Sequence, residues 1–97
     1  MQGLNVGRSY LFTHEAQRLN SLRINFNALC TDDLLRNISA FCPLLTSIEL
    51  RMCQSVTDTG VEALLQRCNK LLYVFLSGTS VSRPMVKDLA QRGLFVF

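Results

Sequence analysis

The side chains best suited to chemistry are four cysteines, Cys30, Cys42, Cys53 and Cys68, and one histidine, His14. The cysteines form no C-x-x-C pair and a single histidine adds little, so the spacing does not predict a metal site. A Cys42–Cys68 disulfide stays open as an alternative, because the two residues are equivalent positions of a repeat. The interpretation that we favour is four buried free thiols in a reducing compartment.

No residue pattern predicts catalysis. The sequence shows no nucleophile beside a base, no pair of catalytic carboxylates and no phosphate-binding loop. We therefore expect a protein that is not an enzyme and that uses no cofactor. His14 is expected on a helix surface rather than as a general base.

Composition narrows the class of partner. The 97 residues are 48% hydrophobic and carry a net charge of +3, with basic residues spread along the chain. Such spreading favours a solvated surface over a nucleic-acid patch. No apolar run approaches the roughly 20 residues that cross a bilayer, and the N-terminal residues do not resemble a signal peptide. We expect no nucleic-acid or membrane partner and a cytoplasmic location, with the nucleus as an alternative.

A repeat of 26 residues organises the chain. The apolar pattern of Cys42, Leu45, Ile48 and Leu50 returns 26 positions later as Cys68, Leu71, Val74 and Leu76. Three units cover residues 16–41, 42–67 and 68–92, and the third is one residue shorter. A fixed period of this length is typical of a solenoid, in which neighbouring units bury a shared core.

The hydrophobic spacing changes within each unit. Alternating apolar residues, as at Leu22 and Ile24, predict a short half-buried strand. Helical spacing follows in each unit, after candidate N-caps at Thr31 or Asp32, Thr57 or Asp58, and Ser82. Successive strands joined through helices must be parallel. The predicted fold is an α/β solenoid with a parallel sheet on its concave side and helices on its convex side.

The two ends are less regular than the middle. Residues 1–15 are interpreted as the rear half of a leading unit without its strand, in which Leu4 is equivalent to Cys30. Residues 93–97 predict either a further strand or an apolar flap over the last unit. We expect residues 1–97 to form a single repeat domain without polar capping units, which leaves end-to-end self-association open.

The second unit resembles the cysteine-containing leucine-rich repeat. It carries the family pattern at Cys42, Leu45, Ile48, Leu50, Cys53, Val56, Thr57, Asp58, Gly60, Val61 and Leu64. The first unit departs from the pattern at Ala16, Asn27, Cys30 and Leu34, and the third unit departs at Thr79, Arg83 and Met85. The resemblance covers about residues 16–93.

The resemblance implies a protein-binding function. Such repeats are familiar from F-box proteins, the substrate receptors of Skp–cullin–F-box ubiquitin ligases. It thus implies the substrate-recognition region of an F-box-type receptor in the ubiquitin-conjugation pathway. These 97 residues leave no room for an F-box, so Skp–cullin partners are implied only if an F-box lies outside this chain. The alternative is a structural or assembly scaffold without a ligase role.

Strand alternation selects the candidate binding residues. If Leu22 and Ile24 point inward, the residues next to them in the strand face outward on the concave surface. The residues at the same positions of the other two units face outward as well. The protein-binding candidates are Arg23, Asn25, Glu49, Arg51, Tyr73 and Phe75. Two alternatives stay open: the C-terminal residues 94–97 cover the aromatic side chains, and the charged side chains only pair across strands.

Overall fold

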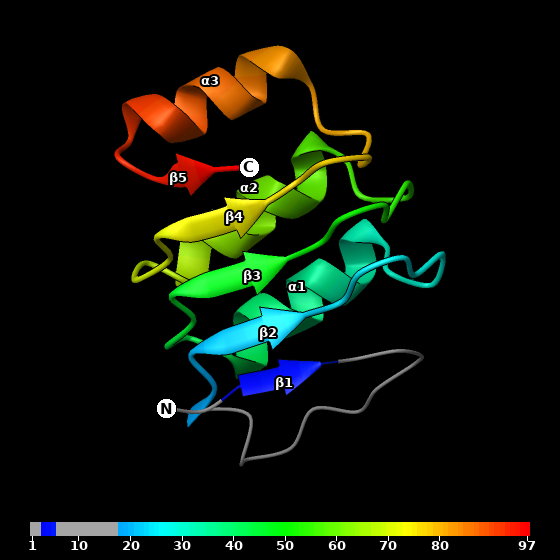
Figure 1. The fold of residues 1–97 in the computed structure, drawn as a ribbon. Coiled ribbons are helices and arrows are strands. Elements are labelled where there is room, and N and C mark those ends of the chain that lie inside the picture. Colours follow the sequence, from blue (N-terminus) through cyan, green and yellow to red (C-terminus); the bar gives the residue numbers. More distant parts are fainter. Residues whose placement is uncertain (1–2, 6–17) are drawn as a thin grey trace.

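The computed structural model describes residues 3–5 and 18–97, which form an α/β fold with a five-stranded parallel sheet (Figure 1). The strands lie in the order β1 to β5, as in the sequence. The elements are β1 (Gly3–Asn5), β2 (Ser21–Arg23), α1 (Asp32–Phe41), β3 (Ser47–Glu49), α2 (Asp58–Arg67), β4 (Tyr73–Phe75), α3 (Arg83–Gln91) and β5 (Phe95–Val96). The predicted α/β class with a parallel sheet is confirmed.

The helices leave one face of the sheet uncovered. Figure 1 shows α1 and α2 behind the sheet, whereas α3 lies next to β5 at the C-terminal edge of the sheet. Among the described residues no helix is long and apolar enough to span a bilayer.

The middle strands pair in a constant register. Ser21 lies opposite Ser47, and Ser47 lies opposite Tyr73. The backbone hydrogen bonds repeat as well: Ile24 N–H donates to Glu49 O at 2.8 Å, and Leu50 N–H donates to Phe75 O at 2.9 Å. Each three-residue strand is therefore held by its neighbours, because a strand this short is not stable alone.

The core lies between the sheet and the helices. It takes alternate residues of each strand and one stripe of each helix, as the spacing predicts. The fully buried larger side chains are Leu22, Ile24, Leu35, Ile38, Leu45, Ile48, Leu50, Leu64, Leu89, Val56, Val61 and Val74.

Each helix begins at a hydroxyl N-cap. Thr31, Thr57 and Ser82 cap α1, α2 and α3, and each accepts a backbone N–H of the first helical turn. These are the hydroxyl members of the predicted alternatives. A hydroxyl at this position satisfies an amide that has no partner within the helix.

Aspartates link each N-cap to the preceding unit. Thr57 donates its N–H to Asp32 Oδ1 (2.8 Å) and its hydroxyl to Asp32 Oδ2 (2.5 Å). Ser82 donates in the same way to Asp58, at 2.7 and 2.6 Å. We call these two contacts the aspartate links. They fix the start of each helix relative to the start of the previous one.

The prediction for the N-terminal end is wrong. Gly3–Asn5 is a strand, and Leu4 pairs with Leu22 rather than occupying the position equivalent to Cys30. Only 18 positions separate these partners, so a shift of 26 residues cannot align them. A three-residue strand with one apolar side chain also gives no alternating pattern. Residues 6–17, including His14, lie outside the described part of the chain.

At the C-terminal end the strand alternative holds. Phe95 pairs with Tyr73, and Phe97 N–H donates to Val74 O at 2.9 Å. The third unit is shorter than the others: Asp58 to Tyr73 is 15 positions, whereas Arg83 to Phe95 is 12. The last residues therefore extend the sheet and do not fold over it.

The four cysteines are free and buried. Cys53 Sγ donates to Ile24 O at 2.6 Å, and Cys68 Sγ donates to Cys42 O at 3.4 Å. The residues equivalent to Cys53 in the other two units also form hydrogen bonds with loop backbone. Asn27 Oδ1 accepts Leu29 N–H, and Thr79 Oγ1 donates to Leu76 O. These side chains stabilise the loops.

Asp58→Asn should destabilise the protein at neutral pH. Hydrogen bonds from Ser82 lower the pKa of Asp58 below 3.8, so its contribution is present above about pH 4 and is lost as the pH falls through the lowered pKa. We expect urea unfolding to show a loss of about 1 kcal/mol at pH 7, shrinking toward pH 2. Asp88→Asn is the control, since its pair with Arg92 is solvent-exposed. Equal losses at both pH values would contradict the role of the charge.

The thiols should react slowly in the folded protein. Burial is the largest cause that raises the pKa of Cys30 and of Cys42 to about 12, and of Cys68 to about 11. Little of these three thiols is therefore thiolate at pH 8. We expect all four cysteines to react with a disulfide reagent within seconds in denaturant and far more slowly in buffer. A native thiol that reacts as fast as in denaturant would contradict the buried placement.

Candidate functional site

The sheet surface opposite α1 and α2 is the candidate site. We call it the open face. It is made by residues that alternate with the core residues along β2 to β5: Ser21, Arg23, Asn25, Ser47, Glu49, Arg51, Tyr73, Phe75, Ser77, Phe95 and Phe97. All six predicted binding residues lie on it. Neighbouring strands place their side chains about 4.8 Å apart, so these residues form one continuous surface.

Charged and amide side chains form the part of the open face over β2 and β3. Arg23 Nε donates to Glu49 Oε2 at 3.0 Å, and Asn25 Nδ2 donates to Glu49 Oε1 at 3.3 Å. Arg51 Nη1 lies 3.6 Å from Glu49 Oε1. Asn25 Oδ1 accepts Arg51 N–H at 3.0 Å. The expected pairing across strands is therefore present, with Glu49 at its centre.

Aromatic side chains form the part over β4 and β5. Tyr73 stacks on Phe95 with ring centroids 5.3 Å apart, and Phe75 stacks on Phe97 at 4.8 Å. Tyr73 is 41% exposed, Phe95 53% and Phe97 56%. We call these four residues the aromatic block. Its rings stack in two nearly parallel pairs and still present apolar surface to solvent.

Arg51 joins the two parts. Its guanidinium carbon lies 4.6 Å from the centroid of the Phe75 ring, within the range of a cation–π contact. The fold thus brings predicted residues from different strands into contact, such as Arg23 with Glu49 and Arg51 with Phe75. Reasoning from sequence missed Phe95 and Phe97 as members of the site. Their alternation around Val96 was the signal that pointed to a strand and hence to this face.

A second apolar feature lies on the loops that follow β2 and β3. Phe26 and Met52 have positive φ angles of 56° and 62°, and the equivalent Gly78 has 76°. Large side chains rarely adopt this conformation. Phe26 is 77% exposed, and a depression of about 320 Å³ lies between it and Met52.

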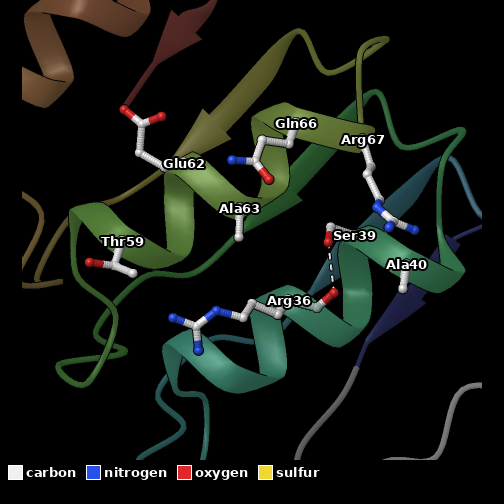
Figure 2. A pocket seen from close by; sticks show the side chains of 8 residues that line it. All are labelled: Arg36, Ser39, Ala40, Thr59, Glu62, Ala63, Gln66 and Arg67. Atoms are coloured by element: carbon white, nitrogen blue, oxygen red, sulfur yellow. Dashed lines mark hydrogen bonds between the residues drawn. The ribbon is translucent and has the colours of Figure 1, made fainter.

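A groove of about 470 Å³ lies between α1 and α2 (Figure 2). Its lining is Arg36, Ser39, Ala40, Thr59, Glu62, Ala63, Gln66 and Arg67. Ser39 Oγ donates to Arg36 O at 2.7 Å, and Arg36 forms an ion pair with Asp33. Figure 2 shows the guanidinium groups of Arg36 and Arg67 well apart. Its charged groups therefore do not converge on one position, and the open face remains the stronger candidate.

Metal-binding side chains do not gather in the described part of the chain. No group of three or more His, Cys, Asp or Glu residues there could hold an ion. The open face instead offers hydrogen-bond donors beside flat apolar surface, which is the chemistry of non-covalent recognition.

A scan against models of protein families finds no match, and a search among curated proteins finds no matching relative.

Proposed function

We propose that this chain is a protein-interaction module that binds a partner on the open face, built as a solenoid of cysteine-containing leucine-rich repeats. The aromatic block beside Arg51 carries the proposal. Tyrosine, phenylalanine and arginine are typical of the few residues that dominate the energy of protein interfaces. No chemistry beyond binding is needed, so the proposal is for a protein that is not an enzyme.

The repeat proposal is supported by the constant 26-residue register and by the aspartate links. In the register, Leu22, Ile48 and Val74 lie side by side and are buried. In the links, Asp32 and Asp58 play the same role for successive helices. Cys53 and Cys68 each bond to backbone of the preceding unit, which gives the cysteines of the pattern a structural role.

Within this proposal, the partner is the substrate of an F-box-type ubiquitin ligase, and an F-box elsewhere in the full protein would recruit the Skp–cullin subunits. The sequence resemblance supports this role. The test is whether the full-length protein co-purifies with Skp–cullin subunits and whether the captured partner is ubiquitinated in a manner that depends on the open face.

An assembly scaffold is the second candidate. One observation favours it: β5 lies at an edge of the sheet. The outward backbone groups of such a strand can pair with another chain. A partner that is captured without Skp–cullin subunits and without ubiquitination would favour this candidate.

Tyr73→Ala combined with Phe75→Ala should weaken partner binding strongly. The double change removes half of the aromatic block and the ring beneath Arg51. We expect affinity for the captured partner to fall about tenfold or more, measured with purified components.

The matched control is Phe41→Ala. Phe41 is 42% exposed at the end of α1, on the helix side of the molecule. Binding should be unchanged in this variant, and circular dichroism should show that all variants fold. Full binding by the folded double variant would show that the open face is not the interface.

A further inference from the structure

The carboxylate at the centre of the open face is already occupied. Glu49 Oε2 accepts from Arg23, and Oε1 lies between Asn25 and Arg51. Its side chain is only 18% exposed, whereas those of Arg23 and Arg51 are 55% and 45% exposed. The positive groups therefore face solvent, and the negative group lies beneath them.

The guanidinium groups of Arg23 and Arg51 have more N–H donors than their contacts with Glu49 use. Each carries five N–H donors, and Arg23 uses Nε for Glu49. Among residues 18–97, no acceptor other than Glu49 is found for either guanidinium. With two cations and one anion, the face carries a local surplus of one positive charge.

Arg51 can bind a further partner. Its guanidinium carbon lies over the Phe75 ring, 4.6 Å from the centroid. A cation–π contact is electrostatic and uses none of the N–H donors in a hydrogen bond, so these donors can still bind a carboxylate. The contact with Phe75 also restricts the side chain, which reduces the entropy lost on binding.

Apolar surface begins directly beside this cation. Phe75 stacks on Phe97, and the exposed rings of Tyr73 and Phe95 continue the aromatic block. A ligand on Arg51 thus lies within about one or two strand spacings, roughly 5–10 Å, of the outermost rings.

We propose that the open face recognises an acidic–apolar peptide segment, in which a carboxylate binds Arg51 and Arg23 while a neighbouring apolar side chain packs on the aromatic block. This inference rests on the proposed function and names the partner chemistry of the same site. In an extended segment, side chains two residues apart point the same way and lie about 7 Å apart. The fitting pattern is therefore Asp or Glu two positions from Phe, Tyr, Leu or Met.

Single-stranded nucleic acid fits this surface less well. Aromatic rings and arginines also bind stacked bases, but such sites follow the backbone with several cations. Here two arginines share the face with Glu49, which repels phosphate. A peptide needs one carboxylate at Arg51 and no continuous run of positive charge.

A random-peptide phage library selected on the immobilised protein tests the inference. Peptides recovered on the wild type and lost on the Tyr73→Ala, Phe75→Ala variant report the open face. We expect these peptides to be enriched in Asp or Glu close to aromatic or aliphatic residues. Elution by salt should be efficient, because the carboxylate contact lies near solvent.

Matched variants then locate the contact. Arg51→Gln should weaken a selected synthetic peptide about tenfold, and Arg67→Gln in the groove between α1 and α2 should leave its affinity unchanged. Replacing Asp by Asn in the peptide should weaken binding to the wild type about tenfold but change little for Arg51→Gln. Calorimetry measures all four combinations.

The outcomes separate the two proposals. Face-dependent peptides without an acidic preference, or an unchanged affinity in Arg51→Gln, would overturn the acidic–apolar inference and leave protein binding intact. Binding of a single-stranded oligonucleotide in place of peptides would overturn it as well. If no peptide depended on Tyr73 and Phe75, the open face itself would be rejected as the interface.

Discussion

The constant pairing register between short parallel strands is the constraint on which the molecule depends. Each of β2, β3 and β4 has three residues, so none is stable without its neighbours. A slip of one residue would turn Leu22, Ile48 and Val74 outward and bring the charged residues into the core. The same register aligns the outward side chains, so the open face is a consequence of core packing.

The helix layer reinforces this register through the aspartate links. Asp32 can reach Thr57 because Gly60 leaves space: a Cβ there would collide with the Asp32 carboxylate and with the Leu35 side chain. Glycine ordinarily lowers helix stability by about 1 kcal/mol relative to alanine. In α2 that cost is offset by the contact that it permits. The helix-side and strand-side contacts thus fix the same spacing.

Much of the fold could be predicted from the sequence, because burial imposes a period. Alternation gave the middle strands, helical stripes gave α1 to α3, and hydroxyl residues marked the N-caps. The strand β1 could not be predicted from a 26-residue shift, since Leu4 is 18 positions from its partner. The positive φ angles of Phe26 and Met52 could not be predicted either. Of the three equivalent positions, only Gly78 has a residue type that favours a left-handed conformation.

The candidate site could be predicted only in part from the sequence. Alternation places Arg23, Glu49 and Tyr73 on one face, but it does not show which side chains are in contact. The aromatic block depends on the shortened third unit. With the spacing of the earlier units, the partner of Tyr73 would lie four positions after Phe95. The missing residues bring Phe95 and Phe97 beside Tyr73 and Phe75. The shortened third unit therefore creates the aromatic block, and the regular spacing of β2 to β4 places the charged residues beside it.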